Sequence, residues 1–156
     1  MTEHSAVTYR SARQGDVDSI VAFQLAMAKE TEDIELHPPT VISGVRTVFE
    51  SPELGRYFVA EQDGQLVASL LITHEWSDWR NRTVWWIQSV FVIPDRRKQG
   101  IYAGLYLYIK SLCENDSSLA GIRLYVDRRN DSAQQVYLRL GMNGDHYQLF
   151  EWMKEF

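Results

Sequence analysis

The chain has little cysteine and no long hydrophobic run. Cys113 is the only cysteine among 156 residues, which excludes an internal disulfide framework and a metal site built from several cysteines. A lone thiol is typical of a reducing compartment, so we expect a cytoplasmic protein that holds no metal. No stretch reaches the roughly 18 apolar residues of a membrane span, and the N-terminus lacks a signal-peptide pattern. We therefore expect no membrane partner.

Positive charge is also scarce. Sixteen Lys and Arg residues face 21 Asp and Glu residues, which gives a net charge of −5. A nucleic-acid-binding surface needs a basic excess, so we expect no nucleic-acid partner. The basic residues near position 97 are then a local feature, suited to a small anion.

The chain shows no repeat, linker or low-complexity segment, and its length predicts a single domain over residues 1–156. Apolar periodicity and turn residues predict the order β-α-α-β-β-β-α-β-α-β, a mixed α/β sheet flanked by helices. The expected strands are Val7–Arg13, Tyr57–Gln62, Gln65–Thr73, Thr83–Ile93, Ile122–Val126 and His146–Met153. The expected helices run from Asp16 to the acidic segment Glu30–Glu35, from Thr40 to about Glu50, over Gln99–Asn115 and over Asp131–Leu140.

The segment from Val90 to Tyr102 carries the clearest functional pattern. It indicates a buried strand, a stop at Pro94, a basic turn and then a helix. A helix N-terminus carries unpaired N–H groups and a partial positive charge, so it binds anions, and Gly100 allows a close approach of the backbone. The sequence therefore predicts a phosphate-sized anion site, against the alternative of a solvated basic turn.

Two motifs resemble those of the GNAT N-acetyltransferase superfamily. Arg97-Lys98-Gln99-Gly100-Ile101-Tyr102 is similar to the family's cofactor loop, Arg/Gln-x-x-Gly-x-Gly/Ala. Asn130, Ala133 and Tyr137 match its second motif, Asn-x-x-Ala-x-x-x-Tyr, and the resemblance covers essentially the whole chain. One position departs from the pattern, because Tyr102 stands where the family usually has a small residue.

The resemblance implies a GNAT-like acyl-CoA N-acyltransferase fold whose central strands splay apart, with a bulge near Phe91, and acetyl-CoA as the cofactor. The strand backbone would pair with the pantetheine arm, and backbone N–H groups of the loop would hold the pyrophosphate while Arg97 lends charge. Asn130 would contact the cofactor arm, and Tyr137 would protonate the leaving thiolate. The implied cofactor-binding residues are Val90, Phe91, Val92, Arg97, Lys98, Gln99, Gly100, Ile101, Tyr102 and Asn130.

The general base and the acceptor are less defined by the sequence. The resemblance implies a glutamate base on the central strand or the next one, but Trp85–Ser89 has no carboxylate. The candidate bases from elsewhere in the chain are Glu30, Glu32, Glu75 and Asp78, or a water molecule. Trp86 is a candidate aromatic wall, because indole faces attract cations. We expect an N-acetyltransferase acting on a small-molecule amine or a peptide amine, with a cationic acceptor.

Two other functions stay open at this stage. The missing strand carboxylate and Tyr102 are compatible with an acyl-CoA-binding or regulatory module that has little or no turnover. Transfer of a longer acyl group, or transfer to oxygen, is the other alternative. The Trp-rich stretch at positions 76–86 also favours a homodimer that covers it.

Overall fold

A five-stranded mixed sheet organises the first part of the chain in the computed structural model, which describes residues 3–155. The strand order is β1-β2-β3-β4-β5, with antiparallel pairing from β1 to β4 and parallel pairing between β4 and β5. The strands are β1 (Thr8–Ser11), β2 (Arg56–Gln62), β3 (Gln65–Ser77), β4 (Arg82–Val92) and β5 (Leu119–Arg123). The predicted mixed α/β class is confirmed.

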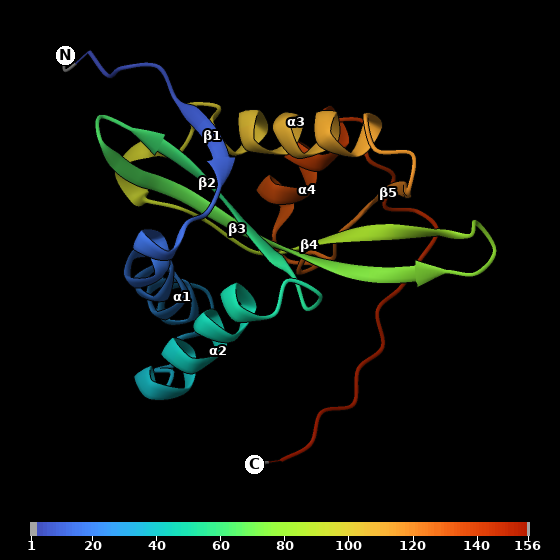
Figure 1. Ribbon diagram of the computed structural model, residues 1–156, viewed down its shortest axis with the longest axis horizontal. Coiled ribbons are helices and arrows are strands. Elements are labelled where there is room, and N and C mark those ends of the chain that lie inside the picture. The colour runs from blue at the N-terminus through green and yellow to red at the C-terminus, as the bar shows by residue number, and fades with distance from the viewer. Residues whose placement is uncertain (1–2, 156) are drawn as a thin grey trace. The chain divides into compact units, whose positions relative to one another are not determined.

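Helices cover both faces of this sheet. Figure 1 shows α1 (Val17–Glu32) and α2 (Pro38–Glu50) on one side and α3 (Ile101–Glu114) on the other. Short 3₁₀ turns at Gln14–Asp16 and Pro94–Arg96 precede α1 and α3. On the α1–α2 side, one buried apolar cluster joins the two helices to β2. Its buried members are Val17, Ile20, Val21, Val45, Tyr57 and Val59.

Aromatic side chains fill the α3 side of the sheet. Phe58 of β2 is fully buried, and its ring lies 6.1 Å from that of Tyr108 on α3 and 6.2 Å from that of Trp85 on β4. Leu105 and Ile109 of α3 are also fully buried. This face of the core therefore fixes α3, and with it the start of that helix, relative to β4.

Local turn chemistry explains the connection between β2 and β3. Asp63 and Gly64 both have positive φ, 54° and 76°, which is the backbone of a tight type I′ hairpin turn. The Asp-Gly signal in the sequence predicted this hairpin, and the prediction is confirmed. β3 continues four residues beyond the predicted Thr73, to Ser77, so it forms a longer ladder with β4.

The chain divides into two compact units, one ending at Arg123 and one beginning at Leu124. The single domain predicted over residues 1–156 stays a prediction. The second unit contains α4 (Asp131–Arg139). The helix ends two residues before Gly141, whose φ is +88°. In the described part of the chain, no helix is both long and apolar enough to cross a membrane.

Two strand predictions are corrected. β5 spans Leu119–Arg123 rather than Ile122–Val126, because its pairing with β4 begins at Thr83 and ends at Trp86. The predicted strand His146–Met153 is not formed within the described residues, where this stretch has no regular structure. Its side chains are exposed, Tyr147 by 81% and Phe150 by 85%. Alternating apolar residues form a strand only when a neighbouring strand pairs with them, so the observed order ends at α4.

Candidate functional site

The distinctive feature of the sheet is that β4 extends beyond the end of β5. β5 pairs with β4 only from Thr83 to Trp86, whereas β4 continues to Val92 alongside β3. Within the described residues, no strand faces the remaining backbone of β4 on the β5 side. These are the splayed central strands that we expected, and an unpaired strand edge can bind an extended polar ligand as an added strand would.

A β-bulge sits inside the unpaired part of β4. Gln88 pairs with Leu71 and Phe91 pairs with Ser69, so two residues of β4, Ser89 and Val90, lie opposite one residue of β3. Ser89 has a φ of +52°, in the left-handed region. Bulges bend a strand and increase its twist. The bulge predicted near Phe91 is therefore present two residues earlier.

The turn after β4 is anchored by Arg96, which is only 9% exposed. Its Nε donates to Gln62 at 3.1 Å, and its guanidinium lies near the carboxylates of Asp63 and Asp95. The sequence predicted no role for Arg96. Nothing in the local pattern distinguishes it, because Gln62 and Asp63 come from a distant hairpin.

Two residues before α3 adopt left-handed backbone conformations. Lys98 and Gly100 both lie in the left-handed region, with φ of 61° and 78°, and Gly100 precedes the first helical residue, Ile101. The N-cap residue is Gly100, which has no side chain to bind the first N–H groups of α3. Uncapped N–H groups at a helix N-terminus next to such a turn form an anion-binding concavity. The exposed Lys98 adds a full positive charge.

The other loop residues have different surroundings. Gln99 is exposed and its Nε2 donates to the Asp95 carbonyl at 3.2 Å. Ile101 is buried in the core at 3% exposure. Tyr102 is half-buried and its hydroxyl oxygen is buried, so its ring lies against protein at the position where the family pattern has a small residue. The loop therefore offers an anion chiefly backbone N–H groups.

Gly100→Ala tests the requirement for glycine at this turn. An L-residue at a φ of +78° costs about 1–2 kcal/mol, and we expect the free energy of unfolding to fall by about this amount. Gly44→Ala is the matched control, because a Cβ has open space at both positions and Gly44 lies inside α2. There we expect a gain of up to about 1 kcal/mol. Urea unfolding measures both, and equal shifts in the two variants would contradict the argument.

Arg97 does not extend away from the protein. Its two Nη atoms bind the two carboxylate oxygens of Glu30, with Nη2 at 2.9 Å from Oε2, and its Nε donates to the Val92 carbonyl at 2.9 Å. The Arg97 hydrogen bond lowers the pKa of Glu30, and the same contact raises the pKa of Arg97. The structure thus brings Glu30, one of the candidate bases, to the turn before α3, but in an ion pair.

The remaining candidate carboxylates lie elsewhere. Glu75 on β3 forms an ion pair with Arg123 at 2.5 Å. Asp78 accepts a hydrogen bond from the Trp79 N–H at 2.9 Å in the turn after β3. Glu32 is exposed at the last position of α1. None of these contacts assigns a general base, so that role stays a prediction.

Trp86 lies where β4 and β5 stop pairing, opposite Thr73 on one side and Arg123 on the other. Its side chain is half-buried. Trp76 and Trp79 are instead exposed, by 63% and 92%, on the part of the β3–β4 hairpin that extends past β2. Of these three tryptophans, Trp86 is the one on β4, and it lies next to the part of β4 that β5 does not pair with.

Asn130 and Tyr137 belong to the second unit. The Asn130 side chain accepts a hydrogen bond from the Ala133 N–H at 3.1 Å, which caps α4. Asparagine is among the best residues for this role, so the Asn-x-x-Ala spacing has a local structural cause. Tyr137 is half-buried on α4, about two turns further along. Their proposed contacts with a cofactor stay predictions.

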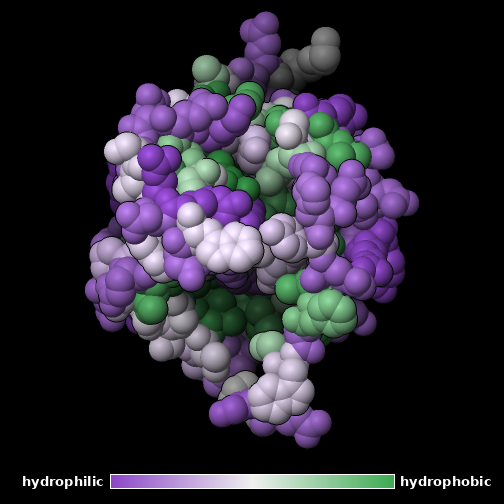
Figure 2. Space-filling model, turned by 90° about the vertical axis from the view of Figure 1, so that its right-hand side faces the viewer, coloured by the Kyte–Doolittle hydropathy of each residue, from purple (hydrophilic) through white to green (hydrophobic). Residues whose placement is uncertain are grey.

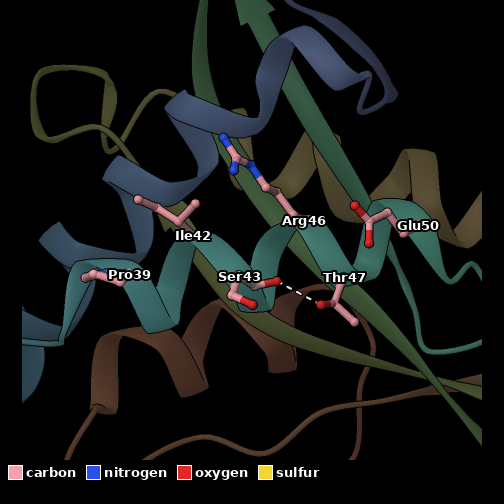
Figure 3. A pocket seen from close by; sticks show the side chains of 6 residues that line it. All are labelled: Pro39, Ile42, Ser43, Arg46, Thr47 and Glu50. Carbon is pink, nitrogen blue, oxygen red and sulfur yellow. Dashed lines mark hydrogen bonds between the residues drawn. The ribbon is translucent and has the colours of Figure 1, made fainter.

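Other surface features offer less chemistry. Figure 3 shows a shallow hollow along α2, where Ser43 and Thr47 face the same way and the Thr47 hydroxyl donates to the Ser43 carbonyl at 2.8 Å. All residues that line it come from one helix, so no second element contributes groups to it. On the face shown in Figure 2, hydrophobic residues reach the surface among hydrophilic ones. The end of β4 with the start of α3 is the better candidate site.

Comparison with protein families gives one match that spans most of the chain. The model of the acetyltransferase (GNAT) family matches residues 22–142. Among curated proteins, no sequence matches the chain. A possible acetyltransferase from Clostridium difficile 630 has a similar structure, with 37% sequence identity and a TM-score of 0.89. The match covers 97% of this chain and 100% of that one.

More distant structures share the fold. One is a predicted acetyltransferase with acetyl-CoA from Clostridium acetobutylicum, at 18% identity and a TM-score of 0.73, covering 94% of this chain and 96% of that one. Another is a ribosomal-protein-alanine N-acetyltransferase from Brucella melitensis biovar Abortus 2308, at 14% identity and a TM-score of 0.77. That match covers 96% of this chain and 100% of the other.

Proposed function

Since the chain belongs to the acetyltransferase (GNAT) family, we propose that it moves an acetyl group from acetyl-CoA to the primary amine of a small, cationic acceptor. The amine attacks the thioester directly, and Tyr137 is the general acid. The family accounts for acetyl transfer from acetyl-CoA in general. The observation that carries the proposal for this chain is the unpaired end of β4 beside the uncapped start of α3.

These elements suit the two chemically distinct parts of the donor. An extended amide-bearing arm matches the end of β4 that has no strand partner on the β5 side, because peptide groups of a strand edge bind such an arm. The Val92 carbonyl is bound by Arg97, so the arm would use the other edge groups of Val90 and Val92. A pyrophosphate matches the first N–H groups of α3 and the Lys98 ammonium group. When bound, acetyl-CoA supplies the acetyl group as a reactive thioester. Gln99, Gly100, Ile101 and Tyr102 contribute to this binding through their backbone.

The chain's own groups then serve the transfer. A backbone N–H at the end of β4, such as that of Val92, stabilises the negative charge that develops on the acetyl oxygen. The Tyr137 phenol donates its proton to the departing sulfur, since a hydroxyl within hydrogen-bond reach can act as a general acid. The proton lost by the attacking amine passes to a carboxylate or to water. No covalent intermediate on the protein is needed.

Support for a cationic acceptor comes from the aromatic and acidic residues. The half-buried Trp86 lies next to the strand edge, and an indole face attracts a cation. The acidic end of α1, which includes Glu32, adds negative charge. The acceptor in our proposal is a small molecule or a peptide amine, and a homodimer that covers the exposed Trp76 and Trp79 belongs to the same proposal. The lone cysteine favours the cytoplasm as the compartment.

One observation favours a second function. Glu30, Glu75 and Asp78 are each engaged in an ion pair or a turn, which leaves fewer carboxylates for a general base. An acyl-CoA-binding or regulatory module with little or no turnover would need no base. The two functions differ in turnover and agree in cofactor binding.

A calorimetric titration followed by a turnover assay separates them. We expect acetyl-CoA to bind with a Kd between about 1 μM and 1 mM, and CoA release to rise with cationic primary amines. Neutral and anionic amines of similar size are the controls for acceptor charge. Binding without CoA release supports the regulatory module, activity confined to anionic amines contradicts the acceptor class, and absence of binding defeats both functions.

A further inference from the structure

The contacts of Arg97 account for most of its hydrogen-bonding capacity. A guanidinium has five N–H groups in a planar fork. In this structure its two Nη atoms bind both oxygens of Glu30, and its Nε binds the Val92 carbonyl. A bidentate contact of this kind fixes the plane of the guanidinium as well as its position. The Arg97 side chain therefore points to α1 and β4.

Aromatic packing supports the same orientation. The guanidinium carbon of Arg97 lies 5.4 Å from the ring centre of Phe91, within the range of a cation–π contact. The Phe91 ring in turn packs on Phe23 of α1 at 5.2 Å. Phe23 and Glu30 lie about two turns apart on α1, and so on the same side of the helix. α1 thus contacts the end of β4 through one apolar and one charged contact.

The hydrogen bond to Val92 constrains the peptide group that matters most at the strand edge. The Ile93 N–H donates to the Val67 carbonyl of β3 at 2.9 Å. Since the C=O and N–H of one trans peptide point in opposite directions, the Val92 carbonyl points away from β3, to the side where β5 has ended. That carbonyl is already bound by Arg97. In an extended strand the N–H of a residue points to the same side as its C=O, so the Val92 N–H also faces this edge.

The ion pair also changes the charge of the loop. A carboxylate that binds both ends of the guanidinium cancels its charge locally. The exposed Lys98 is then the cation of this loop that remains for a phosphate, whereas the resemblance to the family implied a contribution from Arg97. Glu30 and Arg97 are 37–44% exposed, so a ligand phosphate has access to compete for the guanidinium. The two roles of Arg97, clamp or phosphate ligand, predict different behaviour.

We infer that Glu30 is a positioning residue: through Arg97 it fixes the Val92 peptide group at the reactive end of β4. This inference rests on the proposed function. It gives Glu30 a role in aligning the donor, separate from proton transfer. It also links the last turn of α1 to the cofactor loop, across 67 positions of the sequence.

A double-mutant cycle tests the inference, with Glu30→Ala, Arg97→Gln and the double variant, and Asp18→Ala, which removes an exposed carboxylate from the first turn of α1, as the control. We expect each single variant at the clamp to lower kcat by roughly ten-fold, as the loss of a charge-assisted hydrogen bond implies. The double variant should lose no more than either single variant, because both remove the same contact. Asp18→Ala should keep the wild-type kcat.

Affinity for CoA, measured by calorimetry, distinguishes the clamp from a phosphate ligand without any turnover. If Arg97 is a clamp, Glu30→Ala and Arg97→Gln change the Kd in the same direction. If Arg97 binds phosphate, Glu30→Ala frees it and tightens binding several-fold while Arg97→Gln weakens binding, and this opposite pattern would overturn the inference. Arg97→Lys adds a check on geometry: it should behave like Arg97→Gln if the planar fork matters, and wild-type behaviour would overturn the inference.

A spectroscopic measurement keeps the test independent of the proposed function. The ¹³C chemical shift of the Val92 carbonyl and the amide shift of Ile93 report the hydrogen bond from Arg97 in the free protein. Both should move alike in Glu30→Ala and Arg97→Gln and stay unchanged in Asp18→Ala. Unchanged shifts in the first two variants would overturn the clamp, whereas a protein with the clamp but without acetyl transfer would defeat the proposed function alone.

Discussion

Replacing Tyr137 by phenylalanine is expected to lower turnover by roughly 10²–10⁴-fold, the usual contribution of a general acid. The change removes only the hydroxyl and leaves the half-buried ring on α4. Without an acid, the sulfur must leave as an unprotonated thiolate, so the chemical step slows while binding of acetyl-CoA is retained. Steady-state kinetics with saturating amine, together with a calorimetric Kd for CoA, separates the two quantities.

The design includes a matched control and a second donor. Tyr108→Phe removes a hydroxyl from another half-buried tyrosine, on α3 in the aromatic core, and should leave turnover nearly unchanged. An acetyl thioester whose thiol has a lower pKa needs less protonation, so the deficit of Tyr137→Phe should shrink with that donor. Wild-type turnover of Tyr137→Phe would remove the assignment, and an equal loss with both donors would show that the hydroxyl acts in another way.

Phe58→Ala is expected to lower the free energy of unfolding by about 3–5 kcal/mol, the largest effect on stability that we predict. Phe58 is fully buried between Tyr108 and Trp85, and the Arg56 guanidinium lies 5.0 Å from its ring centre. Truncation therefore loses transfer free energy and leaves a cavity between β2, β4 and α3. Urea unfolding followed by tryptophan fluorescence measures the change.

Phe150→Ala is the control for this prediction. Phe150 is 85% exposed, and surface substitutions usually stay within about 0.5 kcal/mol. A loss below about 1 kcal/mol for Phe58→Ala would mean that the α3 side of the sheet is less tightly packed than the ring distances indicate. Because α3 begins at the proposed cofactor loop, a destabilised variant should also bind CoA more weakly.

Local sequence patterns predicted much of the fold. The Asp63-Gly64 dipeptide predicted a hairpin because only a few residues accept positive φ, and the structure has both residues there. Pro94 predicted the end of β4, because proline has no N–H to donate to a strand ladder. Gly100 predicted the turn before α3, because glycine accepts positive φ. Asn130 begins α4 as an N-cap, which depends on residues three positions away. Each of these features depends on neighbours in the chain, so the sequence carries it directly.

Pairing between distant segments was harder to predict. The alternation in His146–Met153 predicted a strand that the structure lacks, and the apolar run Ile122–Val126 predicted β5 about three residues too late. A strand exists only where another strand offers matching N–H and C=O groups, and its own residues do not state where that partner begins or ends. The resemblance to the family implied a bulge near Phe91, and the structure has it at the two preceding residues, Ser89 and Val90.

The sequence by itself determined the elements around the candidate site: an apolar strand, a proline stop, a left-handed glycine and a helix N-terminus, all set by local backbone chemistry. Only the tertiary structure decided what the charged side chains do there. Arg97 binds Glu30 and Val92, Arg96 binds Gln62, and Glu75 binds Arg123. The reason is physical: a long charged side chain takes whichever opposite charge or carbonyl the packed elements place within reach, and no short-range pattern encodes that partner.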